Sequence, residues 1–260
     1  MAPPVVVVLV AHGVDSRVAE ALESLSGQTY RDLDVIVVKL AGAEVASAGR
    51  RVMVIDGPPH ASFPEAVGWG LDNAGGIRAA YVLLLHDDVV LAPDAVARMV
   101  QRASGEGVAA VGAKLVESDD PTVLQEVGGG LDRFAVRRSA LDTGEVDAGQ
   151  RDDVTDVLFS SDACLLVRAD AYAEVGGLDH RAWPLYEDVD LLLPLVGAMR
   201  TDGEPLVYNR ADVSVPDLLV CRRDLATMLL GAIADASRDL PPCEAPRDRS
   251  QPGAPRRAHP

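Results

Sequence analysis

Paired carboxylates follow an apolar run in the first half of the chain. Residues 81–88 read YVLLLHDD, so Asp87 and Asp88 stand where an apolar strand would end. Adjacent aspartates are hard oxygen donors suited to Mg²⁺ or Mn²⁺, and such an ion would offset the charge of a bound diphosphate. His86 precedes them, and its imidazole can ligate Mn²⁺ or hydrogen-bond the site. The same residues also suit a solvated turn that caps the next helix, so the motif alone leaves both interpretations open.

A second acidic group lies later in the chain. Residues 186–190 read YEDVD and precede an apolar segment that suits a helix. Carboxylates in the first turn of a helix gain from the helix dipole, which favours the ionised form that a general base needs. Asp188 and Glu187 are therefore candidate catalytic residues. Acid enrichment in a first helical turn is also ordinary, so this motif too depends on its context.

Both acidic groups need elements that bring them together, and the first half of the chain alternates strand-like with helix-like segments. Strands are expected at residues 5–10, 34–38, 51–55, 81–88 and 108–112, and helices at residues 66–74 and 95–103. This alternation predicts an α/β fold with a mostly parallel central sheet and helices on both faces. Ligands of such sheets bind at the carboxyl ends of the strands, which is where Asp87 and Asp88 would lie.

The second half is expected to complete the same domain. Residues 114–153 read as irregular loops or a hairpin that form the rim of the site. Regular structure is expected to return over residues 154–167, with Cys164 inside an apolar strand. It is followed by a short helix near residues 170–175, a helix from Glu187, and an amphipathic helix at 225–236. We expect one domain over residues 1–236, with a first half (1–112) and a second half (113–236), and a disordered Pro/Arg-rich tail over 237–260.

Composition excludes several classes of protein. The formal net charge of −16 argues against a nucleic-acid interface, because phosphate-backbone binding needs many basic contacts. The three cysteines have no CxxC spacing, which argues against a disulfide framework and a zinc site. No apolar run approaches the roughly 20 residues that span a bilayer, and no basic residue precedes the first apolar run. We expect a cytoplasmic protein with at most peripheral membrane contact, for which the basic tail 238–257 is a candidate.

Several motifs in order resemble a known family. LLLHDDVVLAPDAV, ACLLVRADAYAEVGGLD and WPLYEDVDLLL, with Gln28-Thr29-Tyr30 before them, resemble the inverting family 2 glycosyltransferases of GT-A fold over most of residues 5–215. The resemblance implies a nucleotide-sugar donor and a glycan or lipid-linked acceptor, as in cell-envelope glycan synthesis. It implies that residues 1–112 are the nucleotide-binding half and residues 113–236 the acceptor half. It implies that Asp88, with Asp87, holds Mg²⁺ or Mn²⁺, and that Asp188 is the base that deprotonates the acceptor, with Glu187 beside it.

Other residues are assigned with less support from the motifs. His12, after the first strand, is placed to touch the nucleotide, and Trp183 is a candidate acceptor contact because an aromatic face packs on a sugar ring. Trp69 is expected to pack in the core. Lys39 ends the second strand, at a nucleotide-contacting position where the family usually has an acid.

Further departures from the family concern activity more than fold. His86 stands where the family often has Asp, and Gly68 where Asn is usual. Pro194 is expected to interrupt the helix after the acidic group, and the family's late histidine is missing near residues 213–215. These departures motivate an alternative function, that of a GT-A-like protein that binds a nucleotide, a sugar or a partner protein without transferring a sugar.

Two other nucleotide-binding classes are excluded by their motifs. The first strand is not followed by G-x-G-x-x-G, which argues against a Rossmann dehydrogenase, and the chain has no GxxxxGK[ST].

Overall fold

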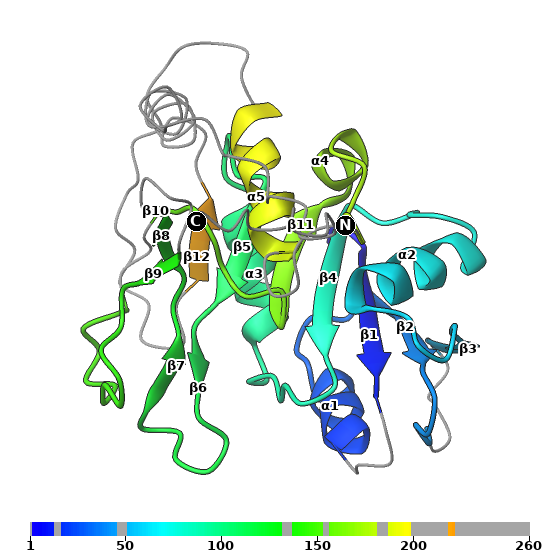
Figure 1. Cartoon of the computed structure of the whole chain (residues 1–260), viewed down its shortest axis with the longest axis horizontal. Helices are drawn as coiled ribbons and strands as arrows, with labels where there is room; N and C mark the ends of the chain where they lie inside the picture. The colour runs from blue at the N-terminus through cyan, green and yellow to red at the C-terminus, as the bar shows by residue number, and fades with distance from the viewer. Residues whose placement is uncertain are drawn as a thin grey trace, which may run out of the picture.

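A single large sheet organises the molecule. The computed structural model describes residues 2–12, 17–45, 51–131, 137–152, 156–180, 187–198 and 218–221. Within these ranges the main sheet has eight strands in the order β10-β12-β5-β11-β4-β1-β2-β3 (Figure 1). The α/β architecture predicted from the sequence is therefore observed.

The first four strands form the parallel part of the sheet. They are β1 (Val5–Ala11), β2 (Leu33–Lys39), β3 (Val52–Asp56) and β4 (Tyr81–His86). β1 pairs in parallel with β2 on one side and β4 on the other, and β2 pairs in parallel with β3. The run of valines in β1 is buried along its whole length, as expected for a strand covered on both faces. The strands predicted at 5–10, 34–38 and 51–55 are thus confirmed within one or two residues.

An antiparallel strand extends the sheet beyond β4. β11 (Cys164–Arg168) pairs antiparallel with β4, with Cys164 opposite Leu85, and β5 (Ala110–Ala113) continues on its far side. β12 (Leu218–Cys221) and β10 (Asp156–Val157) complete the edge. The regular structure expected over 154–167 is divided between two strands, because the polar residues 160–162 separate β10 from β11. The start of β11 consequently lies at the carboxyl end of β4.

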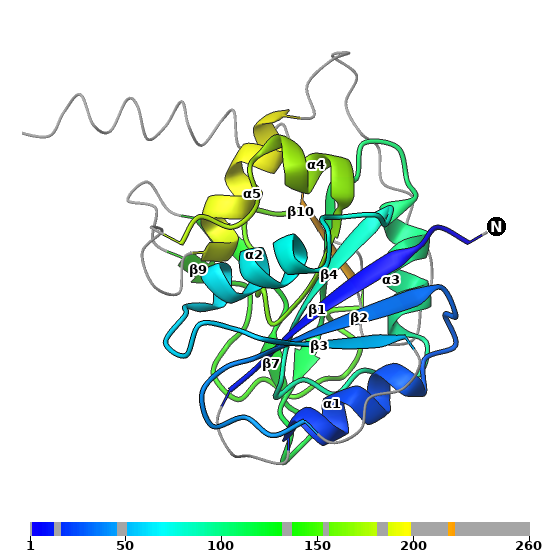
Figure 2. The same cartoon turned by 90° about the vertical axis from the view of Figure 1, so that its right-hand side faces the viewer.

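Helices cover both faces of the sheet (Figure 2). α1 (Arg17–Ser26) and α3 (Ala95–Ala103) pack on one face, and α2 (Phe63–Asn73), α4 (Ala169–Glu174) and α5 (Glu187–Ala198) pack on the other. α5 continues through Pro194, so the interruption predicted there is wrong. A proline costs a helix one backbone hydrogen bond, and packing of Leu191 and Leu192 in the core offsets part of that cost.

Gln28 joins two of these helices. Its side chain is buried, its Nε2 donates to the Ala92 carbonyl at 2.7 Å, and its Oε1 accepts from the Val96 backbone N–H at 3.1 Å. That last bond satisfies a donor in the first turn of α3, which otherwise has no side-chain cap. The glutamine of the family-like QTY triplet therefore has a structural role next to β4.

The segment between β5 and β10 is more regular than expected. It contains the hairpins β6 (Leu115–Val116) with β7 (Leu124–Glu126), and β8 (Gly129–Leu131) with β9 (Arg137–Ser139). A Cβ on Gly129 would lie 2.2 Å from the Arg138 carbonyl oxygen, so only glycine allows the hairpin to close there.

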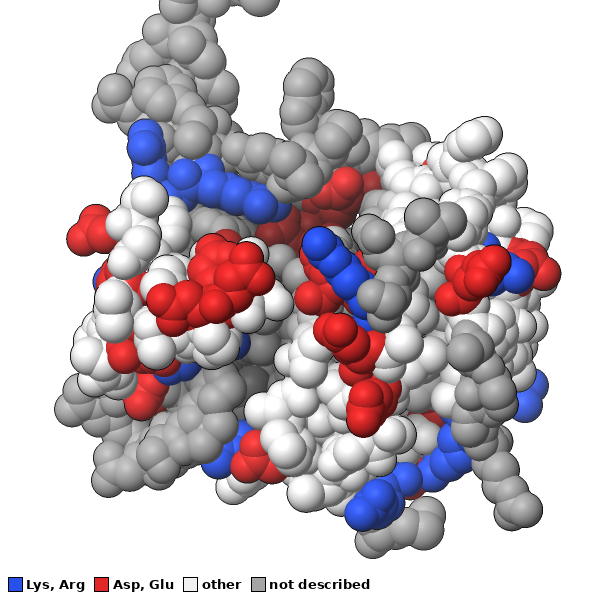
Figure 3. All heavy atoms as spheres, turned by 90° about the horizontal axis from the view of Figure 1, so that it is seen from below, with Lys and Arg blue, Asp and Glu red and all other residues white. Residues whose placement is uncertain are grey.

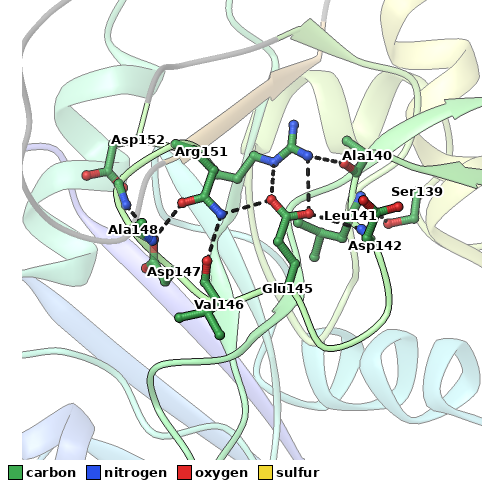
Figure 4. A network of polar contacts seen from close by, with 12 residues as sticks. Ser139, Ala140, Leu141, Asp142, Glu145, Val146, Asp147, Ala148, Arg151 and Asp152 are labelled. Atoms are coloured by element: carbon green, nitrogen blue, oxygen red, sulfur yellow. Dashed lines mark hydrogen bonds and ion pairs between the residues drawn. The ribbon is translucent and has the colours of Figure 1, made fainter.

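A polar network holds the segment that follows β9 (Figure 4). The Glu145 carboxylate accepts from Arg151 Nε at 3.0 Å, from Gln150 Nε2 at 2.9 Å and from the Asp142 backbone N–H at 3.0 Å. The Arg151 guanidinium, with the other two donors, lowers the pKa of Glu145 to about 2. Residues 141–151 form loops and turns with one isolated bridge, as expected, and side chains cross-link them.

Lys114 anchors the same segment to the sheet. Its side chain is 4% exposed, and its Nζ lies 2.8 Å from Asp147 Oδ2 and 2.6 Å from Asp152 Oδ1. Burial alone would lower the pKa of Lys114, but the two carboxylates more than offset it, so the pKa is raised. The ammonium is therefore charged, paired and inaccessible at the end of β5.

Several predictions fall outside the described residues. These are the helix at 225–236, the tail at 237–260, Trp183, and the region near 213–215. None of the described helices has the length and apolar character that crossing a membrane requires.

Lys114→Met should destabilise the fold by about 3 kcal/mol, because it leaves two acids without their buried counter-ion. Lys39→Met is the matched control, since its partner Asp56 is 82% exposed and an exposed pair contributes about 1 kcal/mol or less. Urea unfolding of both variants measures the difference. Equal losses of unfolding free energy would contradict the anchoring role of Lys114.

Candidate active site

Asp87 and Asp88 lie in the turn after β4, at the carboxyl edge of the parallel strands. The Asp87 Oδ2 accepts a hydrogen bond of 2.6 Å from the backbone N–H of His12, at the end of β1. The Asp88 side chain is 51% exposed and lies 4.0 Å from the Arg17 guanidinium. The structure thus brings His12, Asp87 and Asp88 together. Figure 3 views this edge end-on and shows acidic side chains gathered across its middle.

His86 turns away from this pair toward a residue that the sequence did not single out. Its ring centroid lies 4.3 Å from that of Phe63, and its Nε2 lies 3.6 Å from Asp162 Oδ1. Asp162 precedes β11, whose antiparallel pairing places its start beside the end of β4. Asp162 therefore joins the carboxyl edge from the opposite chain direction.

Asp188 occupies the most buried position of the site. It lies in the first turn of α5 and is 2% exposed. Its Oδ1 accepts from the Val189 backbone N–H at 2.7 Å and contacts the Arg137 guanidinium of β9, while its Oδ2 is buried without a hydrogen-bond partner. Burial raises the pKa of Asp188 to about 7, although Arg137 acts in the opposite direction.

Asp188 belongs to a cluster of acids arranged around Arg137. Burial raises the pKa of Glu126, which accepts from the Gly128 N–H, and burial also raises the pKa of Asp162. The negative charges of Asp162 and Glu126 raise the pKa of Asp188 further. We name Glu126, Asp162, Glu187 and Asp188 the acid cluster.

Arg137 is held in place by its surroundings. Its guanidinium carbon lies 5.2 Å from the centroid of the Phe159 ring, an arrangement that favours a cation. β8, the segment between β10 and β11, and α5 meet here, since Leu131, Phe159 and Val189 share a small apolar cluster. The β8–β9 hairpin thus carries the positive charge to the buried base candidate.

The sequence missed Asp162, Glu126 and Arg137. Asp162 carries one weak signal, an acid just before an apolar strand, but its role depends on that strand being antiparallel. Glu126 and Arg137 lie in short strands of a segment without clear periodicity.

Two other predicted residues lie apart from this cluster. The Lys39 Nζ lies 2.8 Å from Asp56 Oδ1, so the two ends of β2 and β3 are paired with each other. Lys39 does reach the carboxyl edge of the sheet, as the prediction requires. Trp183 lies outside the described residues.

The donor atoms at this edge fit a divalent cation only in one mode. Within the described ranges, no three His, Cys, Asp or Glu side chains form a group that could hold a metal. Mg²⁺ is commonly held by one or two carboxylates, with substrate phosphates and water as the remaining ligands. The exposed Asp88 carboxylate, with Asp87 beside it, fits that mode. The residues therefore suit an ion that arrives with a diphosphate, rather than a preformed metal centre.

The geometry separates two kinds of carboxylate. Asp87 and Asp88 are at the rim, where water and cations reach them, whereas Asp188 is desolvated and has a pKa near neutrality. A buried carboxylate with such a pKa is suited to take a proton from a weak acid such as a hydroxyl. The arrangement can therefore bind an anion with its cation at one side and activate an oxygen nucleophile at the other.

Comparisons with known proteins identify the family and the fold. Residues 3–200 match the family described as "Glycosyltransferase like family 2". The structure of mannosyltransferase PcManGT from Pyrobaculum calidifontis, in complex with GDP-Man and Mn²⁺, superposes with a TM-score of 0.53 at 13% identity, over 93% of this chain and 66% of that chain. At this identity the likeness shows the fold alone.

Two curated relatives match parts of the chain. An uncharacterized protein y4gI from Sinorhizobium fredii is 30% identical over 197 residues, which is 68% of this chain and 21% of that protein. A 3'-phosphoadenosine 5'-phosphate phosphatase from Mycobacterium bovis is 46% identical over 70 residues, which is 26% of each chain. The chain thus spans about a quarter or less of the length of these relatives.

The raised pKa of Asp188 predicts a stability that depends on pH. Between its ordinary value of 3.8 and about 7, the folded state keeps a proton that the unfolded state releases. The contribution of Asp188 to stability therefore falls as pH rises through that window and levels off above about 7.

Urea unfolding of the wild type and of Asp188→Asn across this window measures the contribution. The free-energy difference, wild type minus variant, should decrease as pH rises. Glu174→Gln is the control, because Glu174 is exposed at the end of α4 and its substitution should leave the pH dependence unchanged. A wild-type curve parallel to that of Asp188→Asn would contradict the raised pKa.

Proposed function

We propose, because this chain belongs to the glycosyltransferase like family 2 and has the GT-A fold, that it transfers a sugar from a nucleotide-diphosphate donor to an acceptor hydroxyl with inversion. The observation that carries this proposal is Asp188, a buried carboxylate with a pKa of about 7 at the same edge of the sheet as Asp87 and Asp88. A base and a diphosphate-binding acid pair are the two parts that such a reaction needs.

Asp188 would act as the general base. Near neutral pH an appreciable fraction of a carboxyl with a pKa of about 7 is ionised, and it is basic enough to accept the proton of an attacking hydroxyl. Its Oδ1 is held by the Val189 N–H and by Arg137, which leaves Oδ2 for the acceptor. Glu187, at the start of α5, would orient the acceptor beside it.

Asp88 and Asp87 would hold Mg²⁺ or Mn²⁺ together with the donor diphosphate. When bound, the cation neutralises the charge that builds up on the departing nucleoside diphosphate. The His12 backbone N–H fixes the Asp87 carboxylate, and the exposed Asp88 carboxylate is accessible from solvent. The solved relative PcManGT was captured with GDP-Man and Mn²⁺, which supports the same pairing of donor and cation here.

The donor nucleotide would lie along the ends of β1 and β2. His12 follows β1 and is exposed, and Lys39 ends β2. An ammonium at this position offers a charge to the phosphates or a donor to the base. Its pair with Asp56 on the neighbouring strand would hold it in that position.

Several finer features belong to the same proposal. The acceptor would be a glycan or a lipid-linked glycan of the cell envelope, with Trp183 packing on it. The protein would act in the cytoplasm, with at most peripheral membrane contact. Residues 1–236 would form one catalytic domain, with donor contacts in 1–112 and acceptor contacts in 113–236.

A second candidate function is binding without transfer. Arg137 contacts the candidate base directly, and Lys39 replaces the acid usual at its position. The Arg137 contact and the Lys39 replacement would both suit a protein that has kept the nucleotide-sugar fold and lost turnover. The same experiment separates the two functions.

The test measures transfer and donor hydrolysis with a panel of nucleotide sugars in the presence of Mn²⁺. Asp188→Asn should lower kcat by about a hundredfold or more, because an amide cannot accept the proton, while nucleoside diphosphate binding is kept. Glu174→Gln, an exposed acid at the end of α4, should retain the wild-type rate. Equal rates in Asp188→Asn and wild type would remove Asp188 from the mechanism.

Asp88→Asn tests the other side of the site. The variant should lose the increase in nucleoside diphosphate affinity that Mn²⁺ produces, and Asp188→Asn should keep it. Calorimetric titration with and without Mn²⁺ measures both. Wild-type binding that ignores Mn²⁺, with no turnover of any donor, would favour the non-catalytic alternative.

A further inference from the structure

The outer face of α2 lines an open cavity whose lining contains none of the residues assigned to the transfer site. The cavity has a volume of about 620 Å³ and lies between α2, the segment before it, and the segment after α4. Residues Glu65, Gly68, Trp69 and Asp72 face it at helical spacing, while the opposite stripe of α2 is buried on the sheet. His60 and His180 line it from the two neighbouring segments.

Trp69 is the main feature of this cavity. Its side chain was expected in the core, but the structure leaves it 43% exposed, so that prediction is wrong. The indole Nε1 donates to the Asp56 carbonyl oxygen at 3.1 Å, which fixes the orientation of the ring. A large aromatic face held in position beside an open cavity is suited to bind an apolar surface of a ligand.

No contact among the described residues requires a glycine at position 68. Two glycines stand in α2, and they differ in their surroundings. A Cβ on Gly70 would lie 2.4 Å from a Val38 methyl, so the packing of α2 on the sheet requires glycine there. A Cβ on Gly68 would meet nothing within 4 Å. Since glycine weakens a helix relative to alanine, its presence at 68 is explained by the space it leaves in the cavity.

The charges around the cavity restrict what it can bind. Its described lining includes the acids Glu65 and Asp72 and two histidines, and none of these lining residues is Lys or Arg. Part of the Glu65 carboxylate is used by the Ser62 N–H, at 2.8 Å, in the helix cap. Anionic ligands are therefore disfavoured, and groups that donate hydrogen bonds to a carboxylate are favoured.

We propose that this cavity binds a neutral saccharide, with a pyranose ring packed on Trp69 and its hydroxyls bonded to Asp72 and the two imidazoles. A sugar ring combines an apolar C–H face with hydroxyl donors, and this matches one aromatic ring flanked by acids. An organic cation is the competing ligand class. It fits less well, because cation sites surround the charge with several aromatic rings, whereas here Trp69 is accompanied by histidines that repel a cation when protonated.

The proposed saccharide site lies outside the acid cluster. The Phe63 ring, at the start of α2, packs against His86 on the side of the transfer site, whereas Trp69 lies farther along the helix on its outer face. The proposal goes beyond sugar transfer and does not depend on it. Its test contains no nucleotide donor, so failure here and failure of transfer are separate results.

Ligand-observed NMR titration tests the proposal with four defined probes. They are methyl α-mannopyranoside and methyl β-glucopyranoside as neutral sugars, methyl β-glucuronoside as an acidic sugar, and choline as a cation. The full chain should bind at least one neutral glycoside saturably and should bind the glucuronoside more weakly. Choline binding alone, equal binding of the acidic sugar, or no saturable binding would overturn the proposal.

Three substitutions assign the binding to the cavity. Trp69→Ala should weaken the neutral glycoside by roughly tenfold, Asp72→Asn should weaken it severalfold, and Gly68→Gln should block it. Glu20→Gln, an exposed acid of α1 across the sheet, matches Asp72→Asn in charge and should bind like wild type.

The substitutions also carry their own check on folding. Gly68→Ala should unfold at the same or higher urea concentration as wild type, which shows that the position tolerates a side chain. Loss of binding in Trp183→Phe but not in Trp69→Ala would assign the sugar to the acceptor side of the transfer site and overturn the proposal.

Discussion

The carboxylate of Asp188 is buried, where ionisation costs free energy. The surrounding elements supply the positive charge that offsets part of this cost. The residue is 2% exposed, and three further acids lie close to it. A buried charge must be paired or neutral, because desolvation penalises the ionised form. Here the guanidinium of Arg137 provides the pairing, and the two effects together leave the pKa near 7. A carboxylate that was fully solvated would be too weak a base, and one without Arg137 would stay protonated at neutral pH.

This requirement explains the position of the less regular half of the fold. Arg137 reaches Asp188 because the β8–β9 hairpin closes at Gly129 and packs with α5 and the segment between β10 and β11. The segment that follows the hairpin is tied by the Glu145 network and fixed to the sheet by buried Lys114. The parallel strands, by contrast, deliver Asp87 and Asp88 to a solvent-accessible rim. One side of the site is therefore set by the regular sheet, and the other by side-chain contacts in a segment of short strands.

The regular sheet could be predicted from the sequence, whereas the contacts of the segment of short strands could not. β-Branched runs such as 5–10 and the apolar run before Asp87 indicated buried parallel strands, because period and composition are local properties. The acids of α5 were also visible as a helix start. Asp162 and Arg137 were not predictable, since their roles come from an antiparallel pairing and from a hairpin whose closure depends on one glycine. Trp69 was misplaced for a related reason, because the sequence does not say which stripe of α2 faces the sheet.

The central claim is that the Asp188 carboxylate, tuned by burial and by Arg137, activates the acceptor. The measurement that tests it most directly is the pH dependence of kcat/KM for sugar transfer in wild type and in Arg137→Gln. In wild type, the rate should rise with pH through a midpoint near the Asp188 pKa of about 7. In Arg137→Gln the midpoint should move to higher pH, because the positive charge that favours the ionised carboxylate is gone. A profile that is flat through neutral pH, or a midpoint that stays in place or falls in Arg137→Gln, would contradict the account.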